Sequence, residues 1–122
     1  MRYHTPWGRL WNGTRYSLRG LRCALLQEQA FEYEAVVLAV VCAVALSAPL
    51  PPLQGVALVG CWMAVMALEL INSAVEKAFD LIDESFRPEI KAGKDMLSAA
   101  VFLGVCFNIF LWCALAVHCM GK

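Results

Sequence analysis

The chain has 122 residues, of which 61% are hydrophobic and only 16% are charged, and its formal net charge is zero. Soluble domains average about 45–50% apolar and about 25% charged residues, so this composition excludes an ordinary soluble protein. We expect one integral-membrane domain over residues 1–122, and nothing in the sequence indicates nucleic-acid binding.

Residues 1–29 are expected to form an amphipathic helix that lies at the membrane interface. Arg15, Arg19 and Arg22 fall within about 60° of one another on a helix that turns about 100° per residue, and leucines form a neighbouring apolar stripe. Trp7 and Trp11 lie nearby, as is typical of a helix at a bilayer surface. A soluble helix packed on a partner is the alternative.

Three apolar segments follow, and each is predicted to cross the membrane as a helix. Their expected bounds are 30–48, 53–79 and 96–118. A run of prolines ends the first segment, because proline cannot continue a helix. Between the second and third segments we expect a polar loop over 80–93, broken by Pro88. Asp95 then has the residue type of an N-cap for the third helix.

The distribution of basic residues predicts how the chain is oriented. Five arginines precede the first span and four basic residues lie within 77–95, whereas the turn over 47–55 carries no charge. By the positive-inside rule, the N-terminus and the 77–95 segment are cytoplasmic. The turn and the C-terminus then lie on the far side.

A column of polar side chains crosses the second span and carries the functional hypothesis. Glu69 lies in an otherwise apolar run, and Asn72, Glu76 and Asp80 lie about 60°, 20° and 20° from it around the helix. Acids inside membrane spans usually mark ion, proton or substrate pathways. Single polar groups in such helices often only join neighbouring helices, which remains the alternative for Ser73.

The chemistry of this column favours phosphoryl transfer. Glu69 is the deepest acid and is partly desolvated, which makes it a stronger proton acceptor. Glu76 and Glu28 offer hard oxygen ligands near the interface, and Mg²⁺ typically takes one or two carboxylates together with phosphate oxygens. Lys94 and Arg87 are suited to neutralise phosphate charge. These parts predict a site with a metal, cations and a base.

The string Glu69-Leu-Ile-Asn72-Ser73-Ala-Val-Glu76, followed by Lys94-Asp95, resembles the prokaryotic integral-membrane diacylglycerol kinases, which are related to undecaprenol kinase. The resemblance covers nearly the whole chain and includes Tyr16-Ser17 and Glu28-Gln-Ala30-Phe31. It implies an all-α homotrimer in the bacterial inner membrane, with three transmembrane helices and an N-terminal interfacial helix per protomer. It also implies active sites shared between protomers at the cytoplasmic interface.

The resemblance further implies phosphorylation of diacylglycerol to phosphatidate by ATP and Mg²⁺. Glu69 is then the general base with Asn72 in support, and Glu28 and Glu76 hold Mg²⁺. The implied nucleotide contacts are Arg9, Tyr16, Glu28, Glu76, Ser85, Phe86, Arg87, Lys94 and Asp95. The implied lipid contacts are Arg9, Ser17, Ala30, Phe31, Glu34, Glu69, Ser98 and Trp112.

Two other functions fit parts of the sequence. The same chemistry on a polyprenol such as undecaprenol is the nearer alternative. A small proton-coupled transporter using Glu69 is less favoured, because the outer half of the second span, 56–67, has no polar stripe. A structural subunit without catalysis leaves the acidic column unexplained.

Overall fold

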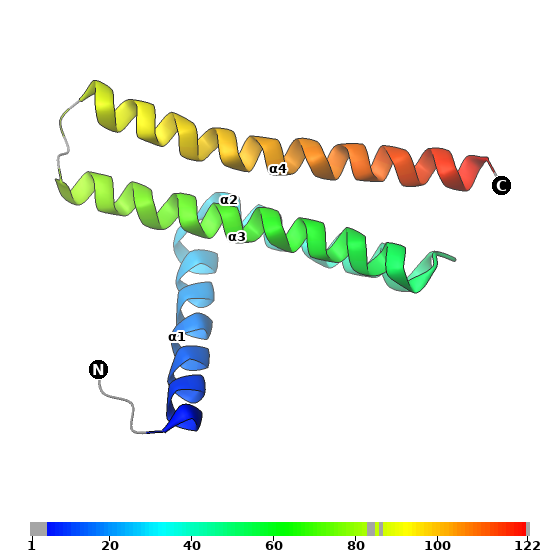
Figure 1. Cartoon of the computed structure of the whole chain (residues 1–122), viewed down its shortest axis with the longest axis horizontal. Coiled ribbons are helices and arrows are strands. Elements are labelled where there is room, and N and C mark those ends of the chain that lie inside the picture. The colour runs from blue at the N-terminus through cyan, green and yellow to red at the C-terminus, as the bar shows by residue number, and fades with distance from the viewer. Residues whose placement is uncertain (1–4, 83–84, 86, 122) are drawn as a thin grey trace.

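The computed structural model describes residues 5–82, 85 and 87–121, and every regular element in these ranges is a helix. The four helices are α1 (Pro6–Gln27), α2 (Gln29–Ser47), α3 (Pro52–Ile82) and α4 (Pro88–Met120). Figure 1 shows α2, α3 and α4 lying lengthwise side by side, while α1 projects crosswise from the start of α2. The expected all-helical chain with three apolar helices long enough to span a membrane is confirmed.

Helix α1 begins and ends at residues with extended backbone. Thr5 caps its start, because its Oγ1 accepts a hydrogen bond of 3.0 Å from the Gly8 N–H, and Pro6 occupies the first helical position. At the other end, Glu28 alone is non-helical, with φ −112° and ψ 107°. The chain therefore changes direction at one residue, and Glu28 lies at the corner between α1 and α2.

Helix α3 is the centre of the bundle, because it packs against α2 on one side and α4 on the other. The most completely buried side chains in this packing are Phe31 of α2 and Leu58 and Val65 of α3. Close approach to α4 depends on Gly104, where an added Cβ would lie 3.2 Å from side-chain atoms of Val65 and Leu68. Glycine thus allows the two long helices to pack tightly.

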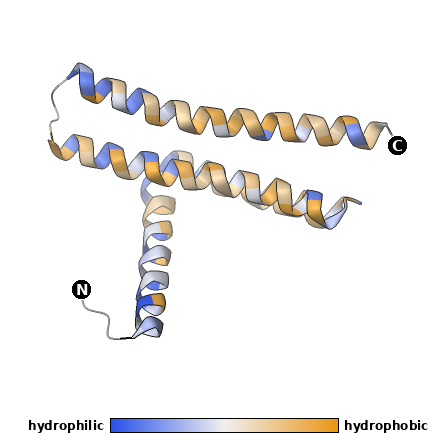
Figure 2. Cartoon of the chain, in the orientation of Figure 1, coloured by the Kyte–Doolittle hydropathy of each residue, from blue (hydrophilic) through white to orange (hydrophobic). Residues whose placement is uncertain are grey.

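Most of the apolar surface of the bundle remains exposed in a single chain. Figure 2 shows hydrophobic residues around the middle of the long helices rather than on one face. A helix that is apolar on all sides needs lipid or other helices around it. The exposed apolar surface is therefore typical of a membrane protein and not of a soluble domain.

Helices α3 and α4 extend beyond the spans predicted over 53–79 and 96–118, and the prediction of a loop between them was mostly wrong. Helix α3 continues to Ile82 and α4 begins at Pro88, so most of the segment predicted as a loop over 80–93 is helical. Pro88 starts α4 instead of breaking it, because proline fits the first helical position, where its missing N–H is not needed. Asp95 is consequently not an N-cap; Arg87 precedes the helix instead.

Two side-chain hydrogen bonds join the long helices within the apolar region. Asn108 on α4 is buried and donates from Nδ2 to the Cys61 carbonyl on α3 at 3.1 Å and to the Gly104 carbonyl at 2.9 Å. Trp62 on α3 donates from Nε1 to the Glu34 carbonyl on α2 at 2.8 Å. These bonds fix the register of α2 and α4 on α3.

Replacing Asn108 by Leu is expected to weaken the fold only slightly. Interhelical hydrogen bonds in membranes average about 0.6 kcal/mol and reach about 1.7 kcal/mol, and Leu keeps a similar volume. The free energy of unfolding in detergent micelles measures this, with exposed Ile109→Leu as the matched control. A variant that fails to fold would show that this bond is essential to the bundle.

Candidate functional site

Charged residues gather at one end of the bundle, where α2 begins, α3 ends and α4 begins. We call this the charged end and define it by Glu28, Glu76, Lys77, Asp80 and Lys94. Figure 2 shows the hydrophilic positions of α3 and α4 concentrated there, and the opposite half of both helices is largely apolar. The acids predicted for catalysis therefore lie at or next to the charged end of the bundle.

Glu69 lies deeper along α3 than the charged end and is buried, with 9% of its surface exposed. The Asn72 side chain is a hydrogen-bonding neighbour of its carboxyl group. Glu76 on the same helix and Glu28 at the α1–α2 corner are near enough for their charges to act on Glu69. Glu34 on α2 interacts with Glu69 in the same way. The charges of three other carboxyl groups, from α3, α2 and the α1–α2 corner, thus act on Glu69.

Two oxygens beside Glu69 are buried without a hydrogen-bond partner among the described residues. They are Oε1 of Glu34 and Oδ1 of Asn72. Buried acceptors are nearly always paired in folded proteins. A polar donor group that enters between α2 and α3 would find an unpaired acceptor there, close to the Glu69 carboxyl group.

Glu28 and Glu76 fit a magnesium–nucleotide complex better than a free metal ion. The described ranges contain no group of three or more His, Cys, Asp or Glu arranged to hold a metal ion by themselves. Two carboxylates, one from the α1–α2 corner and one from α3, are nevertheless a sufficient protein contribution for Mg²⁺, when phosphate oxygens and water complete its octahedron. The donor set is composed of hard oxygens, as Mg²⁺ prefers.

Basic residues reach this end from α3 and α4. Lys94 Nζ lies 2.8 Å from Asp80 Oδ1, and its charge also interacts with Glu76. Asp95 is exposed and pairs with Lys91 at 2.8 Å along α4. Asp95 was expected beside a helix N-terminus, but it lies two turns inside α4. Lys94 therefore contacts the acids of α3, whereas Asp95 is exposed on the surface of α4.

The predicted contacts on α1 do not reach the acids within one chain. Arg9 and Ser17 are exposed, and the 1.5 Å rise per residue separates Arg9 from Glu28 by roughly 28 Å along the helix. Ser17 donates its hydroxyl to the Gly13 carbonyl at 2.9 Å. Tyr16 carries the Arg19 guanidinium over its ring, 5.7 Å from the centroid.

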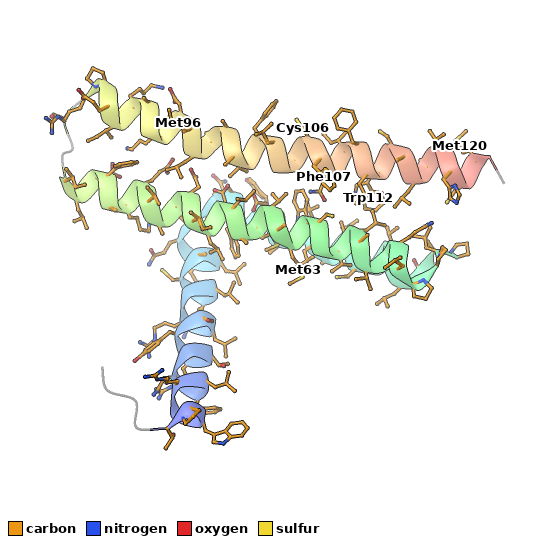
Figure 3. All side chains as sticks on the ribbon, viewed as in Figure 1. Met63, Met96, Cys106, Phe107, Trp112 and Met120 are labelled. Atoms are coloured by element: carbon orange, nitrogen blue, oxygen red, sulfur yellow. The ribbon has the colours of Figure 1, made fainter. Side chains whose placement is uncertain are left out.

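The remaining predicted lipid contacts are spread along the bundle. Phe31 is fully buried at the start of α2 and packs inside the chain, while Ala30 and Ser98 are exposed. Trp112 lies on the C-terminal half of α4, away from the charged end (Figure 3), roughly 21 Å along the helix from Ser98. Gly104 of α4 packs against Val65 and Leu68, next to Glu69, and Trp112 lies roughly 12 Å further along α4, so the structure does not bring Trp112 to Glu69.

The predicted nucleotide contacts between α3 and α4 are only partly described. Ser85 and Arg87 are exposed in the short connection between the two helices. Phe86 lies outside the described residues. The connection belongs to the charged end, so Ser85 and Arg87 lie on the same side of the bundle as Lys94.

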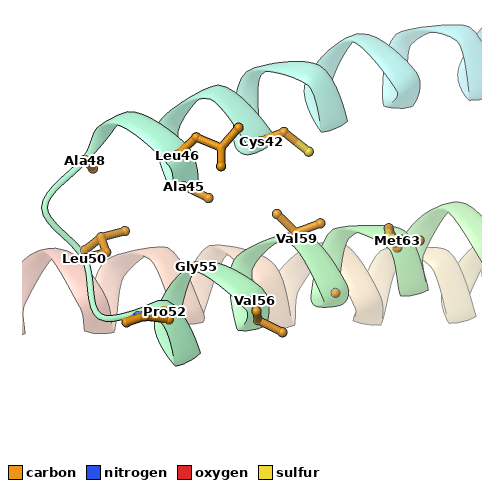
Figure 4. A pocket seen from close by; sticks show the side chains of 11 residues that line it. Cys42, Ala45, Leu46, Ala48, Leu50, Pro52, Gly55, Val56, Val59 and Met63 are labelled. Atoms are coloured by element: carbon orange, nitrogen blue, oxygen red, sulfur yellow. The ribbon is translucent and has the colours of Figure 1, made fainter.

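A groove of about 650 Å³ lies at the opposite end of the bundle, between the end of α2 and the start of α3. Figure 4 shows side chains of both helices facing one another across it. Its lining is Cys42, Ala45, Leu46, Ala48, Leu50, Pro52, Gly55, Val56, Val59, Gly60 and Met63. The lining contains no acid or base, so the groove lies apart from the acids predicted for catalysis.

Two residues at this site were not singled out from the sequence. Trp62 ties α3 to the backbone of Glu34, and Lys77 pairs with Glu28 at 2.7 Å. Both partners are far away in the sequence, so no local spacing signals either contact. Lys77 is otherwise one of the basic residues that any cytoplasmic segment carries.

The comparison with known proteins gives a consistent result. Residues 15–116 match the family described as prokaryotic diacylglycerol kinase. A diacylglycerol kinase of Helicobacter pylori strain J99 is 39% identical over 106 residues, which cover 85% of this chain and 81% of the relative. A diacylglycerol kinase of Escherichia coli K12 is 32% identical over 111 residues, 91% of each chain. One of Haemophilus influenzae is 33% identical over 101 residues, 83% of this chain and 86% of the relative.

Proposed function

Because this chain belongs to the prokaryotic diacylglycerol kinase family, we propose that it transfers the γ-phosphoryl group of ATP to the free hydroxyl of diacylglycerol, with Mg²⁺ as cofactor. The protein is a lipid kinase by its relatives. The observation that carries the proposal is the buried Glu69 carboxyl group, on which the charges of Glu28, Glu34 and Glu76 act.

In the proposed reaction, Glu69 accepts the proton of the lipid hydroxyl. The hydroxyl oxygen forms a bond to the γ-phosphorus, the bond from that phosphorus to the β,γ-bridging oxygen breaks, and ADP leaves. Asn72 hydrogen-bonds to the Glu69 carboxyl group and so orients it toward the hydroxyl. A buried carboxylate suits this role, because a desolvated base accepts a proton more strongly.

Glu28 and Glu76 hold the metal in this proposal, and Lys94 faces the phosphate chain. When bound, Mg²⁺ neutralises charge on the β- and γ-phosphate oxygens. Lys94 is suited to that surrounding because its charge already interacts with Glu76. The charged end therefore combines a base at depth with cation and metal sites nearer its surface, as phosphoryl transfer requires.

We propose that the charged end lies at the cytoplasmic face of the bacterial inner membrane. We also propose a homotrimer with shared sites. The orientation follows from the basic residues of α1 and of the α3–α4 region. A site shared between protomers is supported by the distance of Arg9 and Tyr16 from the acids, and the number of three protomers is what the family resemblance implies. A neighbouring protomer's α1 would supply those nucleotide contacts, and α1 itself would lie in the interface with Trp7 and Trp11 exposed.

The substrate is tested by offering the purified protein two lipids together in mixed micelles with γ-labelled ATP. We expect label to appear in phosphatidate and not in undecaprenyl phosphate. Label confined to the polyprenol would replace diacylglycerol as the substrate while keeping the kinase chemistry. Proton flux in liposomes without phosphorylation of either lipid would contradict the kinase proposal.

A further inference from the structure

Lys77 makes a contact that the proposed mechanism leaves unexplained. Its Nζ lies 2.7 Å from Oε1 of Glu28, and 57% of the Lys77 side chain and 27% of the Glu28 side chain remain exposed. The pair joins α3 to the corner between α1 and α2, 49 residues away in the sequence. The ion pair thus connects two separate parts of the fold and does not lie along one helix.

The contact belongs to an alternating series of charges across the charged end. Lys77 also interacts with Asp80, one turn further along α3. Asp80 pairs with Lys94 of α4 at 2.8 Å, and Lys94 interacts in turn with Glu76. The series therefore runs from the α1–α2 corner through α3 to α4 and surrounds both proposed metal ligands.

This arrangement places the Lys77 ammonium group where the proposed metal would bind. An oxygen of Glu28 that accepts the Lys77 ammonium at 2.7 Å cannot ligate Mg²⁺ through the same lone pair in the same state. The pair is partly exposed, and exposed ion pairs contribute little to stability. Lys77 is therefore free to exchange its partner without disturbing the fold.

We propose that Lys77 neutralises Glu28 while no nucleotide is bound, leaves it when that carboxylate ligates the metal, and then binds the phosphate chain. This inference rests on the proposed function. Residue 77 directly follows Glu76, so its long, flexible side chain stays near the metal ligands after release. A lysine ammonium is a strongly hydrated point charge and binds phosphate without demanding a fixed geometry.

The test uses the full-length protein in micelles and the variant Lys77→Gln. Mn²⁺ alone is titrated by electron paramagnetic resonance, and Mn²⁺ is then titrated with a non-hydrolysable ATP analogue. We expect Mn²⁺ alone to bind the variant about 2- to 5-fold more tightly, the range that loss of one exposed competing charge allows. The affinity for the Mn²⁺–nucleotide complex is expected to fall, and KM for MgATP to rise without change in KM for the lipid.

Lys91→Gln is the matched control. This substitution removes the same charge, but Lys91 pairs with Asp95 on α4 and not with Glu28. Lys77→Arg is expected to restore nucleotide affinity, since it keeps the charge. If the wild type phosphorylates lipid but Lys77→Gln binds Mn²⁺ with unchanged affinity, the proposed role of Lys77 is overturned and the proposed function is not. A wild type that neither binds Mn²⁺ with nucleotide nor phosphorylates lipid would overturn the proposed function as well.

Discussion

Replacing Glu69 by Gln is expected to lower the rate of lipid phosphorylation by about 10²- to 10⁴-fold, the usual contribution of a general base. Gln keeps the shape of the side chain and its hydrogen bonding with Asn72, but it cannot take the hydroxyl proton. The fold is expected to survive, because a neutral amide is easier to bury than a carboxylate. Initial rates with saturating lipid and ATP measure the effect.

Glu32→Gln is the matched control for that variant. Glu32 is exposed on α2, two residues from Glu34, and the same change in charge there should leave turnover near that of the wild type. Circular dichroism of both variants separates a loss of chemistry from a loss of structure. Near-normal turnover of Glu69→Gln would remove Glu69 from the role of base.

Replacing Glu76 by Gln is expected to raise the Mg²⁺ concentration needed for half-maximal activity by at least about 10-fold, the scale on which even residues that only support metal ligands act. High Mg²⁺ should restore part of the activity, because Glu28 remains as a ligand. The measurement is the Mg²⁺ dependence of the rate at fixed ATP. An unchanged requirement, or a loss that Mg²⁺ never relieves, would contradict the assignment of Glu76 to the metal.

These two variants separate the proposed roles of the two acids. Glu69 lies about two turns deeper along α3 than Glu76, so it is suited to meet the lipid rather than the nucleotide. Extra Mg²⁺ should therefore not rescue Glu69→Gln. The comparison tests whether the column of acids divides into a proton acceptor and a metal ligand.

The sequence was sufficient to predict the helices and the acidic column. Three apolar runs of this length have few alternatives to spanning helices, because backbone polar groups in lipid must pair internally. The spacing of Glu69, Asn72 and Glu76 fixed their common face, and the electrostatic contacts of Glu69 with Glu76 agree with it. Periodicity is reliable where one long helix carries all the residues.

Features that depend on contacts between helices were not predicted. The start of α4 was missed because Pro88 breaks a helix in its interior but fits at its first position. Asn108 was overlooked as a single polar group in an apolar run, although that isolation was a usable signal. The Lys77–Glu28 pair depends on how α1 turns into α2, which no local pattern encodes.

The position of α1 leaves the predicted site incomplete in one chain. Arg9 and Tyr16 lie far from the acids, although the family resemblance implies that they bind nucleotide. A trimer with shared sites would resolve the difference, since α1 projects away from α2, α3 and α4 (Figure 1). The exposed apolar faces of α2, α3 and α4 provide the surface for such packing.

The account is tested most directly by asking whether bound metal approaches the lipid hydroxyl at the charged end. Mn²⁺ with a non-hydrolysable ATP analogue is added to the protein in micelles with diacylglycerol carrying ¹³C at the hydroxyl-bearing carbon. We predict strong paramagnetic relaxation of that carbon relative to the terminal acyl carbons, and its loss when Glu28 and Glu76 are both replaced by Gln. Equal relaxation at both positions, or an effect that persists in the double variant, would contradict the account.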